Sequence, residues 1–584
     1  MNGGRSLSLT PKFRAIYNKL LQGSKPSQIS PNDSEDAFFS HLFSLDVDRA
    51  FLLQKLNEPS KSAYLGYLKP LLNTIFLQCV KQFNAAQKED VRRAHCLETL
   101  QISLRCMFNK NMSGWEVMEV MAGGVGQSDE YFMNFVVFIE ETIVDTLIPA
   151  RVRHQALQVA LIYMCGIGQL SPGAYFLRRN LFPSIATFIK TPDTEQFTFE
   201  ASLLLALLAN YHKSDAAKLN PYLQRIRQVD DKDLIRQICW ASDYALQAAI
   251  KAYQEVSDDS PPTFTSTLAS MVISMRPDRA LASKPLDPPR ELFKSLPIEA
   301  TAVLLLLFEF TRTNSTFNSV LIDYLSPDLE KPGTSKPIHG RLPLTILTLS
   351  SYLITHASST ASPRAAAYAN LCLNVLLAFV ENGALLRALT PPVPQTIRLC
   401  RQNGQTRLEY HWGELWRALC GLLEFLVAKQ DSLATTGGVE QLSKETILCI
   451  YLSLYRADHF LPTPRLIHEF IYELVRSLEC FRKLAILQET LAVPQSPGRR
   501  GSNSFELPID RLGRIIATLQ YYEEKIQTAD ARSAKAALRV LAGEVNRDGV
   551  HGTPEQEISE PSKQLDDVLT FARYACADGL SLMP

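Results

Sequence analysis

The 584-residue chain has no excess of charge of either sign, because 60 lysines and arginines are matched by 60 aspartates and glutamates. This balance gives no bulk reason to expect nucleic acid or an anionic membrane as a partner. Long apolar runs are also lacking. The run over residues 302–310 is short and includes Glu309, and the run over residues 365–380 is interrupted by Asn370 and Asn374. Since a spanning helix needs about 20 predominantly apolar residues, neither run is expected to cross a membrane.

Cysteine and histidine are present without the spacing of a metal site or a disulfide framework. The 11 cysteines are scattered, none forms a CxxC pair, and most lie in apolar helical patterns such as residues 371–373 (LCL). This usage is typical of small core residues in a reducing compartment. His459 and His468 lie beside acidic residues, but a proline-containing break over residues 461–464 separates them, so we predict no metal site. Residues 1–30 lack the apolar core of a signal peptide, and we do not expect secretion.

Motifs of catalysis are missing as well. The glycine cluster at residues 123–126 (GGVG) follows no predicted strand, and the sequence holds no HExxH, GxSxG or kinase signature. His95 and Cys96 are adjacent, but neighbours on a helix point about 100° apart and do not readily pair. We therefore predict no enzyme activity and no cofactor.

What the sequence does contain is a succession of predicted helices. From about residue 34 apolar residues recur at helical spacing, and short breaks such as residues 58–60 (EPS) interrupt them at intervals of about 20 residues. Helix pairs that recur every 40 or so residues are typical of HEAT and armadillo arrays. We predict an all-α fold, an armadillo/HEAT-like α-solenoid of stacked helix pairs.

Breaks in the helical pattern divide the chain into six segments. We expect a disordered tail over 1–32, an N-terminal helical-repeat array over 33–258, a middle helical array with Pro-rich loops over 259–400, a C-terminal helical module over 401–491, a disordered insertion over 492–507, and C-terminal helices with a linker over 508–584. The insertion is rich in Pro, Gln, Ser, Gly and Arg and has no apolar pattern.

Two of the four tryptophans, Trp412 and Trp416, lie in one predicted helix of the C-terminal module. Trp412 belongs to an apolar stripe with steps of four and three residues, and Trp416 lies beside that stripe. Tryptophan is enriched at interface hot spots, but the stripe favours a core role. Arg92 and Arg93 follow the acidic start of another predicted helix, where they form either a solvated face or part of a partner site. The candidate partner or structural anchors are thus Trp412, Trp416, Arg92 and Arg93.

Two serines of the insertion are candidate phosphorylation sites. Ser502 follows Arg499-Arg500-Gly501, which fits a basic-directed kinase, and Ser496 precedes a proline, which fits a proline-directed kinase. A phosphate beside two arginines would change the charge of this segment.

Several segments, which occur in the family's order from about residue 60 to 480, resemble the armadillo-like helical domain-containing protein 3 family. They are residues 89–100 (EDVRRAHCLETL), 204–211 (LLALLANY), 220–222 (NPY), 264–275 (FTSTLASMVISM), 407–426, and 460–464 (FLPTP) with 472–473 (YE). A weaker similarity continues at residues 514–516 and 525–526.

The resemblance implies a cytosolic, non-catalytic scaffold or adaptor that associates peripherally with the Golgi. It also implies two protein partners, a phosphatidylinositol 4-kinase of the beta type and a Golgi guanine-nucleotide exchange factor for Arf GTPases, and a role in phosphoinositide supply, Golgi organisation and secretion. The alternative is an integral or lipid-handling membrane protein that uses the apolar runs 302–310 and 365–380.

Overall fold

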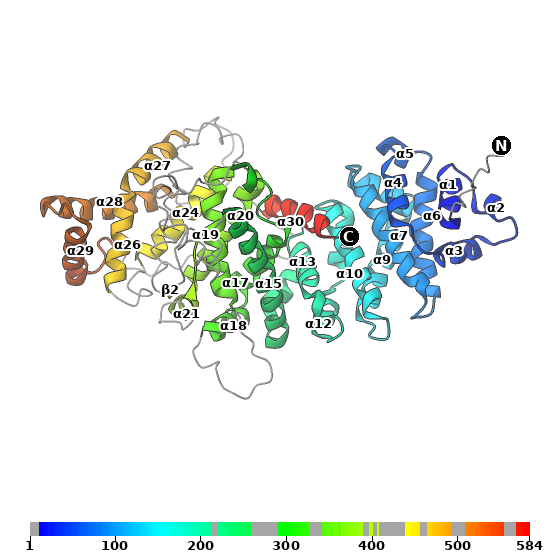
Figure 1. The fold of residues 1–584 in the computed structure, drawn as a ribbon, viewed down its shortest axis with the longest axis horizontal. Helices are drawn as coiled ribbons and strands as arrows, with labels where there is room; N and C mark the ends of the chain where they lie inside the picture. Colours follow the sequence, from blue (N-terminus) through cyan, green and yellow to red (C-terminus); the bar gives the residue numbers. More distant parts are fainter. Residues whose placement is uncertain are drawn as a thin grey trace, which may run out of the picture. The chain divides into compact units, whose positions relative to one another are not determined.

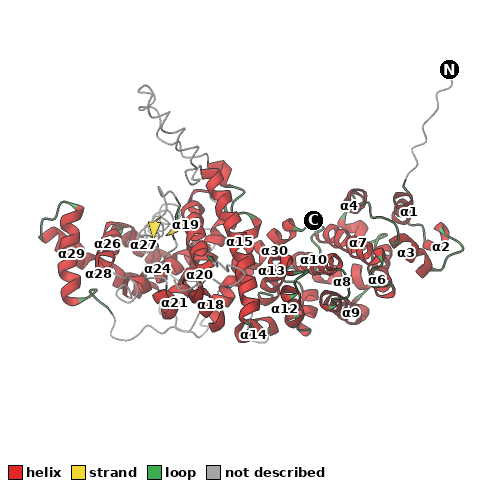
Figure 2. Cartoon of the chain, turned by 60° about the horizontal axis from the view of Figure 1, so that its bottom comes forward, coloured by secondary structure: helices red, strands yellow, loops and turns green. Residues whose placement is uncertain are grey.

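The computed structural model describes residues 11–211, 220–257, 290–325, 341–360, 362–388, 396–400, 406–407, 438–455, 464–491, 508–553 and 568–583. Helices make up nearly all of these residues (Figure 1). The exception is one antiparallel pair of two-residue strands, β1 (Thr396–Ile397) and β2 (Thr406–Arg407), visible in Figure 2. The predicted all-α fold of the armadillo/HEAT-like α-solenoid class is confirmed.

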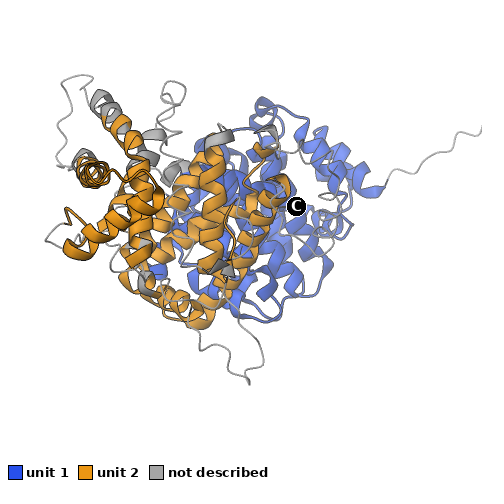
Figure 3. Ribbon diagram, turned by 60° about the vertical axis from the view of Figure 1, so that its left-hand side comes forward, with its two compact units in different colours: residues 1–228, 567–584 blue, residues 229–566 orange. Residues whose placement is uncertain are grey.

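The chain divides into two compact units, coloured separately in Figure 3. Unit 1 comprises residues 1–228 and 567–584, and unit 2 comprises residues 229–566. The last helix of the chain thus belongs to the same unit as the first. Apart from the N-terminal tail, which contains two helices, the division into six segments stays a prediction.

Unit 1 is built from helices that range from the three-residue η2 to the 20-residue α9. Its helices are α1 (Lys12–Leu21), α2 (Pro26–Ile29), α3 (Glu35–Phe43), α4 (Arg49–Asn57), α5 (Lys61–Leu65), α6 (Lys69–Ala85), α7 (Val91–Phe108), α8 (Gly114–Ala122), α9 (Val125–Val144), α10 (Ala150–Ile167), η1 (Ser171–Ala174), α11 (Tyr175–Arg178), α12 (Phe182–Lys190), η2 (Glu195–Phe197), α13 (Thr198–Ala209), α14 (Pro221–Gln228) and α30 (Val568–Leu582).

The centre of unit 1 is α10, which packs against α7, α9, α13 and α30. Every residue from Ala156 to Cys165 is buried, as expected of a helix that is apolar on all sides. Helix α30 lies very close to α10 at Gly579, where an added Cβ would be 2.7 Å from Cys165 Sγ. Just after the end of α30, the Met583 carbonyl accepts a hydrogen bond from Arg105 Nη1 of α7 at 2.7 Å.

The prediction of a disordered tail over residues 1–32 is wrong for part of this range, because α1 and α2 lie within it. Phe13, Tyr17 and Leu20 are buried on one face of α1, and the Phe13 and Tyr17 rings are 4.6 Å apart. Their spacing of four and three residues is that of a helix that packs on a core, although the surrounding sequence is polar.

Unit 2 contains the longest helix of the described chain, α15 (Lys232–Ser257), and the strand pair. Its other elements are η4 (Arg290–Phe293), η5 (Glu299–Val303), α17 (Leu304–Thr313), α18 (Ser315–Leu325), α19 (Leu342–Thr360), α20 (Pro363–Glu381), α21 (Gly383–Ala388), α24 (Gly438–Tyr455), α26 (Pro464–Arg476), α27 (Leu478–Leu491), α28 (Pro508–Thr528) and α29 (Ala534–Asp548). Helix α15 packs against α18 and α19, while α20 packs against α17, α19 and α24.

The two apolar runs of the sequence are core segments of unit 2. Residues 302–310 lie in η5 and α17, where Glu309 is fully buried and forms an ion pair with Arg312 at 3.3 Å. Residues 365–380 lie in α20, where Asn374 Nδ2 donates to the Asn370 carbonyl at 2.9 Å. Among the helices that the structure describes, none has the length and apolar character to span a membrane.

Candidate protein-interaction site

Arg92 is held at the start of α7 by the residue that caps this helix. The Asp90 carboxylate accepts the Arg92 backbone N–H at 2.9 Å and both Nε and Nη2 of its guanidinium at 2.8 and 2.6 Å. Arg92 Nη1 donates to Ser40 Oγ of α3 at 2.7 Å. The hydrogen bond between the two side chains lowers the pKa of Asp90 and raises the pKa of Arg92. Arg92 is thus only partly exposed and its donors already have acceptors within the unit.

Arg93 is the more deeply buried of the two arginines. Its Nε and Nη2 donate to the Ala86 carbonyl at 3.1 and 2.9 Å, just after the end of α6. Its guanidinium carbon lies 4.6 Å from the centre of the Phe83 ring, and burial lowers the pKa of Arg93. Because an unpaired carbonyl at a helix end is costly to bury, this geometry favours the structural role of Arg93 over a role in partner binding.

The remaining residues singled out from the sequence lie outside the described part of the chain. They are Trp412, Trp416, Ser496 and Ser502. Their roles as anchors and as phosphorylation sites stay predictions.

Histidines and acids do not gather into a metal site within the described residues, where no group of three or more His, Cys, Asp or Glu side chains could hold an ion. His468 is buried in α26, and burial lowers the pKa of its imidazole. His95 Nδ1 lies 2.9 Å from the Phe43 carbonyl, while its neighbour Cys96 is buried.

An exposed aromatic pair lies on α15, in a position that sequence reasoning missed. Trp240 is 61% exposed and Tyr244 is 73% exposed, and their rings stack at 6.3 Å with an interplanar angle of 22°. Single exposed apolar residues are common, but two large rings stacked side by side form a small exposed apolar patch, and Trp and Tyr are enriched in protein interfaces. This pair is the candidate protein-interaction site of unit 2.

The rest of α15 explains why the pair faces outward. Its buried stripe includes Leu234, Ile238 and Leu246, and it packs on α18 and α19. Trp240 and Tyr244 are four residues apart and fall off this stripe, so they lie one turn above the other on the opposite side. The signal was present in the sequence as an aromatic pair at helical spacing on the polar side of an amphipathic helix.

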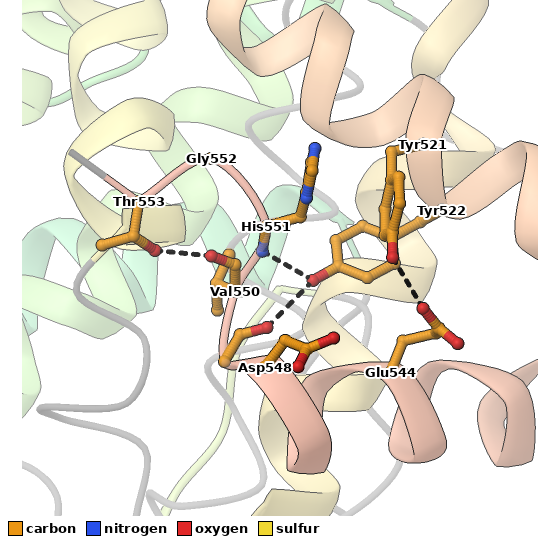
Figure 4. Close-up of a pocket in the computed structure, with 9 residues that line it drawn as sticks. Tyr521, Tyr522, Glu544, Asp548, Val550, His551, Gly552 and Thr553 are labelled. Carbon is orange, nitrogen blue, oxygen red and sulfur yellow. Dashed lines mark hydrogen bonds between the residues drawn. The ribbon is translucent and has the colours of Figure 1, made fainter.

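A second surface feature is a hollow of about 400 Å³ beside α28 and α29 (Figure 4). The Tyr521 hydroxyl donates to Glu544 Oε2 at 2.6 Å, and the His551 ring stacks on Tyr521 at 3.9 Å. The Tyr522 hydroxyl accepts the His551 backbone N–H at 2.9 Å. The chain bends around the hollow at Gly549, whose φ of +73° is in the left-handed region that favours glycine.

The electrostatics of this hollow are balanced internally. The hydrogen bond from Tyr521 lowers the pKa of Glu544 and raises the pKa of the tyrosine. Arg547 and Lys525 also pair with Glu544, at 2.9 and 3.6 Å. Since the carboxylate is compensated by two cations and a phenol, the contacts explain how the turn after α29 is held, and they give no sign of a general acid or base.

The packed helices of both units define an all-α protein of the armadillo/HEAT-like α-solenoid class. Residues 397–549 match the family model described as Armadillo-like helical domain-containing protein 3, C-terminal. The chain is 22% identical to Armadillo-like helical domain-containing protein 3 of Danio rerio over 617 residues, which cover 89% of this chain and 85% of that protein. The protein of the same name from Homo sapiens is also 22% identical, over 621 residues and with the same two coverages. The predicted resemblance to this family is therefore confirmed over most of the chain.

Among solved structures, the chain is similar to the crystal structure of SYS-1, with 12% identity and a TM-score of 0.29. The match covers 87% of this chain and 91% of that one. A complex of SYS-1 with POP-1 matches with a TM-score of 0.28.

Proposed function

We propose that this protein is a non-enzymatic helical-repeat scaffold that binds other proteins. The observation that carries the proposal is the exposed Trp240–Tyr244 pair on a long, well-packed helix of a repeat fold. A rigid helix that presents two aromatic side chains offers a large contact area at a small cost in conformational entropy. Recruitment then works by raising the local concentration of a bound partner.

The partners that we propose are a phosphatidylinositol 4-kinase of the beta type and a Golgi guanine-nucleotide exchange factor for Arf GTPases. The support is the family resemblance, which extends over 89% of the chain. Through these partners the protein would lie in the cytosol, peripherally associated with the Golgi, and would support phosphoinositide supply and secretion. The membrane-spanning alternative is less favoured, because residues 302–310 and 365–380 contribute to the buried core of unit 2.

Affinity purification followed by mass spectrometry, from the cells that naturally make the protein, tests this proposal. The full-length chain is compared with the double variant Trp240→Ser/Tyr244→Ser. Trp115→Ser is the matched control, because Trp115 is 57% exposed but lies on α8 of unit 1. We expect the kinase and the exchange factor to be enriched with the wild type and with the control. Loss of two hot-spot side chains costs about 2 kcal/mol or more, so the double variant should recover at least about 30-fold less of one partner.

The outcomes separate the fold-level proposal from the particular partners. Absence of any Golgi kinase or exchange factor from the wild-type sample would contradict the named partners. Equal recovery by the wild type and the double variant would remove the α15 pair from the binding surface. Carbonate extraction of membranes provides a further check, because a peripheral scaffold is released and an integral protein is retained.

A further inference from the structure

The thiols that the structure describes fall into two kinds. All of them except Cys400 are buried. Burial raises the pKa of Cys372 to about 12 and that of Cys106 to about 11, which keeps these groups protonated and unreactive at neutral pH. Cys400 is only partly buried and has a different environment.

Cys400 lies just after β1, against helix α19. Its Sγ is 3.5 Å from His356 Nε2, within hydrogen-bonding distance for sulfur. Its backbone N–H donates to Ser351 Oγ at 3.0 Å, and Ser351 Oγ in turn donates to the Thr348 carbonyl at 2.6 Å. Both His356 and Ser351 belong to α19. One helix therefore fixes the backbone of the cysteine and also presents an imidazole to its sulfur.

The imidazole itself is held between aromatic rings. His356 is 3% exposed, and Phe293 stacks on it at 4.3 Å and 16°. Tyr253 stacks at 5.5 Å and 17°, and Tyr352 at 6.4 Å and 12°. These nearly parallel rings restrict the plane of the imidazole, whose Nε2 lies 3.5 Å from the Cys400 sulfur. Aromatic faces also attract a cation, which offsets part of the cost of burying an imidazolium.

The surrounding titratable groups come from α15 and α20. Tyr253 of α15 is buried, and burial raises the pKa of its phenol, so it is neutral. Arg364 of α20 opposes that rise in the pKa of Tyr253, and its guanidinium carbon lies 5.4 Å from the centre of the Tyr368 ring. Cys372 of α20 is protonated and uncharged at neutral pH, because burial raises its pKa to about 12.

From this geometry we infer that Cys400 is a nucleophilic thiol and a modification site for small soft electrophiles, hydroperoxides in particular, with His356 as its base. The inference is independent of the proposed scaffold function. In the first step the Cys400 thiol gives its proton to His356 Nε2. The thiolate then attacks one oxygen of the hydroperoxide, an S–O bond forms and the O–O bond breaks. The sulfur is oxidised to sulfenic acid, and the departing alkoxide or hydroxide takes the proton from the imidazolium, leaving an alcohol or water.

The experiment measures the alkylation of each cysteine in the native full-length chain by iodoacetamide, resolved by mass spectrometry of peptides, between pH 6 and pH 9.5. Wild type is compared with His356→Gln, which keeps a polar side chain but cannot take the proton. His154→Gln is the matched control, because His154 stacks on Phe197 and pairs with Glu200 in unit 1, whereas Cys400 belongs to unit 2. Ser351→Ala is a second variant, which removes the acceptor of the Cys400 N–H and leaves His356 in place. A parallel sample is treated with hydrogen peroxide and dimedone.

We expect Cys400 to be alkylated faster than every buried cysteine. Its rate should rise with pH and reach its plateau before pH 8. His356→Gln should slow the alkylation of Cys400 at pH 7 on the order of tenfold and shift its profile toward an ordinary thiol with a pKa of about 8.5. Ser351→Ala should slow it less, and His154→Gln should not change it. Dimedone should label Cys400 in the wild type and the control.

Two results overturn the inference. One is a wild-type profile for Cys400 that follows an ordinary thiol, which is decisive even where His356→Gln does not fold. The other is an unchanged rate in a folded His356→Gln protein, as judged by circular dichroism.

Discussion

A single added methyl group should destabilise unit 1, and the sign of its effect should reverse when one ring is removed. Gly166 lies near the end of α10, with the ring of Phe108 from α7 directly over it. A Cβ at this position would lie 2.0 Å from Cδ2, 2.3 Å from Cγ and 2.7 Å from Cε2 of that ring. These distances are far below van der Waals contact, so Gly166→Ala forces the ring or the helix to move.

Two opposing terms set the magnitude. Alanine is favoured over glycine inside a helix by roughly 0.5–1 kcal/mol. Overpacking a core costs about 1–3 kcal/mol, and the Phe108 ring has little room because it packs edge-on to Tyr163 at 6.1 Å. The two ranges give a net cost between about 0 and 2.5 kcal/mol. Because the added Cβ would lie only 2.0 Å from the ring, we expect Gly166→Ala to lower the stability of unit 1 by about 1–2 kcal/mol.

Hydrogen exchange of peptides from α10, followed by mass spectrometry, is the suitable assay. A chain of two compact units need not unfold in one step, and local exchange reports the stability of the unit that contains the peptide. Gly513→Ala on α28 is the control, because a Cβ there meets no atom within 4 Å. It should leave α10 unchanged and stabilise α28 by about 0.5–1 kcal/mol.

The same substitution in a Phe108→Ala variant tests whether the Phe108 ring causes the loss of stability. Once the ring is gone, only the helix-propensity term is left, and Gly166→Ala should stabilise α10 by about 0.5–1 kcal/mol. The reasoning is refuted if Gly166→Ala is as stable as the wild type. It is equally refuted if the loss of stability is the same with and without the Phe108 ring.

Three further predictions concern stability. Arg93→Ala should destabilise α7 by about 1–3 kcal/mol in hydrogen exchange, because the buried Ala86 carbonyl loses both donors, and an unchanged α7 would contradict the structural role. Asp90 has a pKa below its ordinary 3.8, so its charge contributes stability that is present above that value and is lost as pH falls through the lowered pKa. The stability difference between wild type and Asp90→Asn should therefore be constant above about pH 5 and shrink in acid, and thermal unfolding at a series of pH values checks this. Trp412→Ala should unfold or destabilise the C-terminal helical module over residues 401–491, and a fully stable variant that only loses a partner would contradict a core role for Trp412.

Local sequence patterns predicted the fold class, because the apolar spacing of a helix can be recognised within a few residues. Apolar residues at helical spacing and short breaks were sufficient for the all-α array. The same criterion applied to Phe13, Tyr17 and Leu20 would have found α1, but the polar composition around them favoured a tail. The packing of α30 on α10 is a different case. Periodicity shows that a helix has a face to bury and does not show which helix covers it, and here the partner is several hundred residues away in the sequence.

Sequence patterns also fail to show which individual side chains lie together. Arg92 and Arg93 are adjacent and were indistinguishable as candidates, yet one is partly exposed at a helix start and the other is buried against Phe83. His95 and Cys96 are also adjacent, and the turn of the helix keeps them apart as a catalytic pair. Cys400 and His356 are 44 residues apart in sequence, and their contact exists because the Cys400 backbone is bonded to the helix that bears His356. A reactive pair in a helical-repeat protein is therefore to be sought between elements that pack together, since neighbours along one helix point in different directions.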